Sequence, residues 1–113
     1  LVAAPSDILK VTAEFFVDQE LPGHLLVSLL GPFWWRRVGS TFRPLTPRRR
    51  IRELDIPLLL IHPEHDRRVV REHADELAKA AGMEYRLIPD REHTDVLGDP
   101  LTLRFVLEFL EDV

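Results

Sequence analysis

Residues 56–66 read Ile-Pro-Leu-Leu-Leu-Ile-His-Pro-Glu-His-Asp, and we expect the rest of the chain to fold around this stretch. Apart from Pro57, every residue from Ile56 to Ile61 is aliphatic. Such an unbroken run predicts a strand that is covered on both faces, as in a parallel sheet, and a proline is tolerated at the start of the strand. The sequence then turns polar at His62 and reaches Asp66. Because ligands bind beyond the carboxyl ends of the strands in open α/β sheets, we expect a functional site near Asp66.

The sequence after this stretch predicts a helix, a strand and a second helix. Residues with helical spacing and a closing glycine at Gly82 mark the first helix, namely Val70, Ala74, Leu77 and Ala81. Residues 84–88 are expected to form the strand, and a polar loop over residues 90–94 follows it. Asp99-Pro100 is a helix start signal. The apolar face of this last helix is expected to comprise Leu103, Val106, Leu107, Leu110 and Val113, flanked by Phe105 and Phe109.

The sequence before this stretch predicts mainly helices. Residues 1–5 resemble the end of a core strand, and Ser6 is expected to cap a helix that runs to about residues 18–20. A second helix should start near Pro22 and be interrupted at Gly31-Pro32, and its expected apolar face is Leu25, Leu26, Leu29, Leu30 and Phe33. Residues 38–44 are predicted to be a loop, and Thr46-Pro47 starts a short helix. The fold class is therefore α/β, with a partial parallel sheet of about three strands and flanking helices.

The composition limits the classes of function. The 113 residues carry a net charge of −4 and no cysteine. This charge is too small and of the wrong sign to favour nucleic acid or an anionic membrane, and without cysteine there is neither a disulfide nor thiolate chemistry. No signal peptide or membrane span is apparent, so we expect a cytoplasmic protein. The chain opens on Leu1 instead of Met, and we expect a piece of a longer protein; a full chain after tag removal or renumbering is the alternative.

Two residues at the ends of successive predicted strands carry the candidate chemistry. Asp66 follows the first strand and His93 follows the next one. The carboxyl ends of adjacent parallel strands lie at one edge of the sheet, so the two side chains should meet there. An aspartate that orients and charges a histidine forms two parts of a nucleophile–histidine–acid triad.

With these residues in place, the chain resembles the C-terminal part of the α/β-hydrolase fold. The resemblance rests on the Ile-Pro-opened strand, on Asp66 before a valine-containing helix start, and on Glu92-His93 followed by an amphipathic last helix. It implies that Asp66 is the triad acid and His93 the triad base, with no cofactor and no metal. It also implies that residues 1–5 end a core strand, residues 6–50 form a lid, and residues 51–113 form the C-terminal core. Pro63 and Glu92 depart from the family pattern, which has glycine at both positions.

The resemblance implies a serine hydrolase that acts on ester or thioester bonds of a small acyl substrate. However, the sequence contains no Gly-x-Ser-x-Gly motif, because none of its three serines, Ser6, Ser28 and Ser40, has a glycine two residues before it and another two residues after it. We therefore expect the nucleophile to precede Leu1 in a parent protein and the 113 residues to be inactive alone. The alternative is a non-catalytic sub-domain, or a degenerate hydrolase that serves as an interaction module. The strand edge at Leu1–Ala4 could then support a homodimer.

Three further groups of residues have two interpretations each. His62, His65, Asp66 and His73 could bind a metal, but their spacing matches no zinc pattern, and surface histidines are the favoured interpretation, with His62 packing at the strand end. The arginines at 36, 37, 43, 48, 49, 50 and 52 could bind phosphate, but a solvated helix face is favoured. Phe33, Trp34 and Trp35 are candidates for lining a substrate pocket, although packing between lid and core is slightly favoured for the tryptophans, because neighbouring residues of a helix cannot both face one pocket.

Overall fold

The computed structural model describes residues 1–38 and 46–113, so most of the loop predicted over residues 38–44 lies outside the described residues. The elements are, in order, α1 (Ile8–Asp18), α2 (Gly23–Val38), α3 (Pro47–Arg50), the 3₁₀ turn η2 (Ile51–Glu53), β1 (Ile61–Pro63), α4 (Arg71–Ala81), β2 (Arg86–Ile88), the 3₁₀ turn η3 (Val96–Gly98) and α5 (Pro100–Asp112). This mixture of helices and strands confirms the α/β class.

The sheet is small and parallel. β1 pairs with β2 in the register that places Ile61 beside Arg86 and Pro63 beside Ile88. On the other side of β1, Val2 forms an isolated parallel bridge with Ile61. The start of the chain therefore joins the sheet as a bridge, and the described residues form two strands instead of the expected three. The predicted parallel pairing is confirmed.

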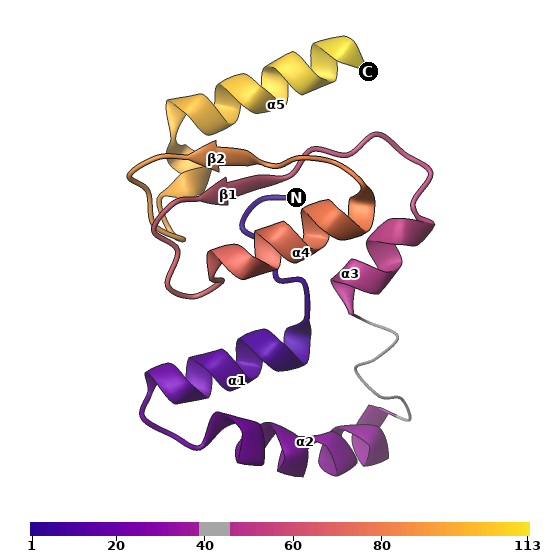
Figure 1. Cartoon of the computed structure of the whole chain (residues 1–113), viewed down its shortest axis with the longest axis vertical. Coiled ribbons are helices and arrows are strands. Elements are labelled where there is room, and N and C mark those ends of the chain that lie inside the picture. The colour runs from indigo at the N-terminus through magenta and orange to yellow at the C-terminus, as the bar shows by residue number, and fades with distance from the viewer. Residues whose placement is uncertain (39–45) are drawn as a thin grey trace.

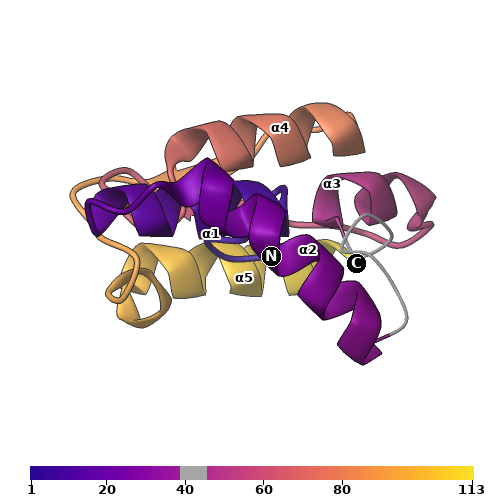
Figure 2. The ribbon, with the colours of Figure 1, turned by 90° about the horizontal axis from the view of Figure 1, so that it is seen from below.

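Helices cover both faces of this sheet, with α4 on one side and α5 on the other (Figures 1 and 2). Successive residues of the central stretch point to opposite faces, as the pleat of a strand requires. Leu60 packs toward α4 with Leu77 and Ala78. Ile61 packs with Ile88, against which α5 is placed. The expected burial on both faces is thus confirmed for the part of the stretch that reaches the sheet.

The strand itself is shorter than its sequence suggests. Ile56 is 60% exposed, and regular pairing begins only at Ile61. Backbone bonds to the sheet start at Leu59, whose carbonyl accepts from the amino group of Leu1 at 2.7 Å, and at Leu60, whose carbonyl accepts from Arg86 N–H at 2.7 Å. The neighbouring strand β2 spans only three residues, so the upstream aliphatic residues have no partner to extend the ladder.

Helix ends largely follow the sequence signals. Gly82 ends α4 in the left-handed conformation, with φ +68°, and Asp99 caps α5 by accepting a hydrogen bond from Leu101 N–H at 2.8 Å. Thr46 and Pro47 start α3 as expected. The prediction for α1 is wrong by one residue, because Asp7 is the cap, accepting from Leu9 N–H at 2.9 Å and Lys10 N–H at 3.2 Å.

The predicted interruption of α2 is wrong, and the predicted apolar faces of α2 and α5 are largely exposed. α2 continues through Gly31 and Pro32, because a helix of 16 residues can lose the one hydrogen bond that a proline removes. Most of its predicted apolar face is exposed, as are Leu103, Leu107 and Leu110 on α5 and Val113 directly after it. Of the predicted α5 face, Val106 does pack on the core, together with Leu101 and the flanking Phe105, and Thr102 is 3% exposed. Both stripes of α5 are apolar, so the sequence alone could not choose between them.

Helices α1 and α2 form a hairpin at the end of the molecule farthest from α5 (Figure 1). Gly23 allows them to approach closely, because a Cβ at this position would collide with the carbonyl oxygen of Ala13. The hairpin belongs to the region predicted to be a lid, residues 6–50, and its contacts with the core decide the shape of the site described below.

Candidate active site

Asp66 is held in a fixed orientation just past β1. Its side chain is completely buried. Oδ1 accepts hydrogen bonds from the backbone N–H groups of Arg68 at 2.9 Å and Val69 at 2.8 Å. This local turn satisfies one carboxylate oxygen and leaves the other, Oδ2, for a partner outside the turn.

That partner is His93, which lies in the polar loop after β2. His93 Nδ1 is 2.7 Å from Asp66 Oδ2, and the side chain of His93 is 32% exposed. The predicted meeting of the two side chains at the same edge of the sheet is therefore confirmed. An ionised carboxylate only accepts hydrogen bonds, so Nδ1 carries the proton in this pair and Nε2 is the nitrogen left to act as a base.

His93 lines a cleft of about 730 Å³. One wall comes from α1 and the residue that ends it, and contains Val11, Thr12, Phe15, Asp18 and Gln19. The other wall comes from the loops that follow the two strands, with His65, Arg67, Arg68, Val69, Glu92, His93 and Thr94. The cleft thus combines apolar surface with two arginines, two carboxylates and the Asp66-oriented imidazole.

The residues predicted to line a substrate pocket lie elsewhere. Phe33, Trp34 and Trp35 are on α2 and are not among the residues that line the cleft, and Phe33 and Trp35 are 58% and 60% exposed. Phe15 of α1 takes this place. Phe15 falls within the helix predicted to run to about residues 18–20, but no local sequence signal indicates that its side chain faces His93.

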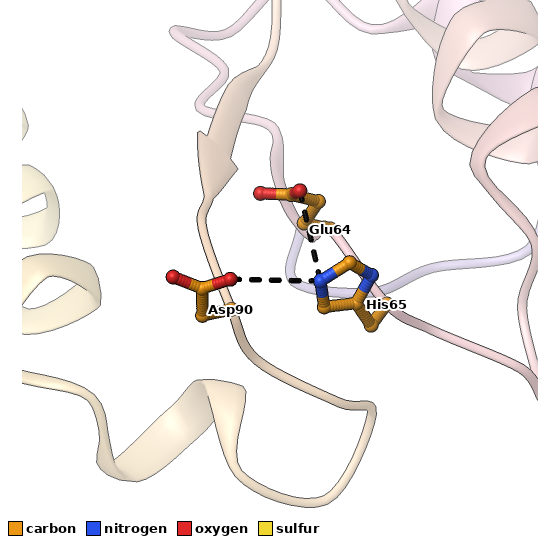
Figure 3. Close-up of side chains that lie close together, drawn as sticks. All are labelled: Glu64, His65 and Asp90. Carbon is orange, nitrogen blue, oxygen red and sulfur yellow. Dashed lines mark ion pairs between the residues drawn. The ribbon is translucent and has the colours of Figure 1, made fainter.

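Glu64, His65 and Asp90 are the described residues whose side chains could share a metal ion. Their ligand atoms all lie within 4.8 Å of one another, and His65 Nε2 is 3.6 Å from Glu64 Oε1 and from Asp90 Oδ1. Figure 3 shows both carboxylates facing the imidazole. Asp90 is 92% exposed and only three protein ligands are offered, so the arrangement is that of a surface ion-pair cluster. The four residues of the predicted metal alternative, by contrast, do not form such a group.

Two histidines are buried, and of these only His73 was expected at the surface. His73 on α4 is 0% exposed and its ring lies between Ser6 and Glu14. His62 on β1 is 1% exposed, which confirms the expectation that it packs at the strand end. Burial lowers the pKa of His62, and Nε2 of its ring has no hydrogen-bond partner within residues 1–38 and 46–113. This favours the neutral imidazole.

The arginine-rich segment is partly engaged in ion pairs. Arg48 lies 3.6 Å from both Asp7 and Glu76, and Arg50 lies 2.8 Å from Glu53. The side chains of Arg48, Arg49 and Arg52 also line a second hollow of about 560 Å³, beside Asp7. Because carboxylates accompany these arginines, the solvated, ion-paired interpretation fits better than a phosphate site. Arg43 lies outside the described residues.

Comparisons with models of protein families, with curated proteins and with solved structures each find no match. In the part of the chain that the structure covers, no helix has the length and apolar character needed to cross a membrane. Any functional interpretation therefore depends on the geometry of the cleft.

Proposed function

We propose that the cleft is the acid–histidine part of a hydrolase site of the α/β-hydrolase type, acting on ester or thioester bonds of a small acyl substrate. The observation that carries this proposal is the 2.7 Å contact between His93 Nδ1 and the buried Asp66 Oδ2 beside an open cleft. Asp66 fixes the tautomer of His93, so that Nε2 accepts a proton from a nucleophile and returns it to the leaving group. Asp66 also stabilises the imidazolium that forms between these steps.

The nucleophile in this proposal is a serine hydroxyl supplied by a segment outside the 113 residues. Ser6 is 0% exposed, and its hydroxyl is engaged with Glu76 and His73, so it is closed to substrate. Ser28 lies on α2, where its hydroxyl donates to His24 O at 2.8 Å. The hydroxyl of Thr12 in the cleft donates to Ile8 O at 2.7 Å. Ser40 lies outside the described residues, and the described residues supply the base, the acid and part of the acyl pocket in this proposal.

The proposal can be tested on the chain as it stands with an activated ester, 4-nitrophenyl acetate, whose hydrolysis an accessible imidazole promotes without a serine. His93→Gln should lower the hydrolysis rate by about tenfold or more, since a positioned base contributes at least this much. The matched control is His24→Gln, because His24 is an exposed histidine on α2 that does not line the cleft, so its loss should lower the rate only by the small share of one free imidazole. Equal rates for the unaltered chain and the His93→Gln variant would reject the proposal.

A second candidate, a non-catalytic interaction module, is favoured by the outer side of α5. Leu103, Leu107 and Leu110 are between 52% and 62% exposed there, which is unusual for three leucines on one helix. A homodimer through the edge at Leu1–Ala4 stays a prediction of this alternative. A molar mass from light scattering that stays monomeric across micromolar concentrations would count against the dimer.

A further inference from the structure

The α1–α2 hairpin contributes nothing to the hydrophobic clusters of the core. One cluster is built around Ala3, Ile61, Ile88 and Val96, and the other around Ile51, Leu60, Leu77 and Ala78. The apolar residues packed against them come from the first four residues, from 58–59, from α4 and the segment after it, and from α5. Among the described residues, neither cluster therefore contains a side chain of α1 or α2, although Ala13 of α1 is 2% exposed. Polar contacts instead join the hairpin to the core.

Ser6 supplies the first connection, because all of its polar groups bind the core side of the molecule. Its N–H lies 3.1 Å from His73 Nδ1, and its hydroxyl donates to Glu76 Oε2 at 2.6 Å. Its carbonyl accepts from Arg48 N–H at 3.0 Å. Ser6 lies where the chain enters α1, and Arg48 lies where the chain returns to the core, so both connections of the hairpin meet at this residue.

Side chains of α1 extend the network. His73 Nε2 is 2.8 Å from Glu14 Oε2, and because Nδ1 accepts from Ser6 N–H, Nε2 is the nitrogen that donates. Lys10 Nζ is 2.8 Å from Glu76 Oε1. The hydrogen bond from Lys10, followed by that from Ser6, lowers the pKa of Glu76. Charged hydrogen bonds to a completely buried imidazole are strong and directional, so they fix one orientation of α1 on α4.

From these contacts we propose that α1 and α2 form a cover that is held on the core chiefly by the polar network of Ser6, Glu14, His73 and Glu76, since neither helix contributes to the two hydrophobic clusters. The network positions Val11, Thr12 and Phe15 as the wall of the cleft opposite His93. It is a positioning device, since none of its four residues lines the cleft. The inference does not depend on the proposed hydrolase function, because it concerns only how the wall is held.

Amide hydrogen exchange of the Glu76→Gln variant, followed by mass spectrometry, tests whether the polar network holds α1 and α2 on the core. The substitution keeps the shape of the side chain but removes the charge that Lys10 and Arg48 contact. Amide exchange in α1 and α2 should rise by about tenfold, while α5, β1 and β2 keep their rates, because the loss of one charged hydrogen bond frees the hairpin alone. The ring signals of His93 in an NMR spectrum should move as the opposite wall is withdrawn. The control is Glu108→Gln, which removes an exposed pair with Arg104 on α5.

Lys10→Gln provides a second variant that should fold even if Glu76→Gln does not, since Lys10 is 39% exposed. In Lys10→Gln, amide exchange in α1 and α2 should again rise, but by a smaller factor than in Glu76→Gln. Salt at about 1 M, where the Debye length is ~3 Å, should raise the exchange rates of these two helices further. Unchanged exchange in α1 and α2 in both variants would overturn the inference. An equal rise throughout the chain would also overturn it, because the network would then be part of one cooperative core.

Discussion

Replacing Asp66 separates its two roles, orienting His93 and closing the turn after β1. In Asp66→Asn, the amide oxygen can still accept from Arg68 and Val69 N–H, so the amide nitrogen faces His93 Nδ1. An amide nitrogen only donates, so Nδ1 must give up its proton and neutral His93 must change to the Nε2–H tautomer. The Asn variant should therefore lose its base at Nε2 while keeping the fold.

The expected losses of stability follow from the same three hydrogen bonds. Exchanging a charged hydrogen bond for a neutral one in Asp66→Asn should cost about 1–2 kcal/mol. Asp66→Ala removes the acceptor for both backbone N–H groups as well, and with Val69 only 6% exposed the total should reach about 2–4 kcal/mol. For a domain with about 5–15 kcal/mol of unfolding free energy, both losses are measurable by urea denaturation.

Nitrogen-15 NMR of the imidazole rings gives the tautomer directly, because protonated and unprotonated ring nitrogens resonate far apart. The control is Asp90→Asn, since Asp90 is 92% exposed and has φ +55°, a conformation that asparagine also tolerates. This control should change the stability by less than about 0.5 kcal/mol. Retention of the Nδ1–H tautomer in Asp66→Asn, or equal stability of the Asn and Ala variants, would refute the reasoning.

Two further predictions concern stability. Burial lowers the pKa of His62 below its ordinary value of about 6.5, so as the pH falls the unfolded chain binds a proton on His62 before the folded chain does. The free energy of unfolding should therefore decrease below about pH 6.5, by at most about 1.4 kcal/mol per pH unit. In urea titrations His62→Gln should reduce this slope, and an unaltered slope would contradict the assignment. Gly82→Ala should cost about 1–2 kcal/mol, because a Cβ there meets no atom within 4 Å but φ is +68°. The control is Gly98→Ala, because a Cβ at Gly98 also meets no atom within 4 Å and Gly98 does not have a positive φ. A similar loss of stability in Gly98→Ala would show that the backbone conformation of Gly82 is not the cause.

The sequence alone determined the order of the elements and the position of the candidate site. Helix stop and start signals at Gly82 and Asp99 are local, since the backbone conformation and the capping bond involve only neighbouring residues. The pairing of Asp66 with His93 was also predictable. A strand–helix–strand unit of this length is parallel, and parallel neighbours present their carboxyl ends at one edge.

Only the tertiary structure decided which surfaces meet. Ser6 looks like a helix cap in the sequence, yet it is the buried junction of three elements, because His73 and Glu76 come from a helix far along the chain. Similarly, α5 has two apolar stripes, and the sheet selected the one with Phe105. Phe15 instead of Trp35 lines the cleft for the same reason. Hydrophobicity is non-directional, so a sequence can state that a side chain is apolar, while its partner is fixed only when the whole chain packs.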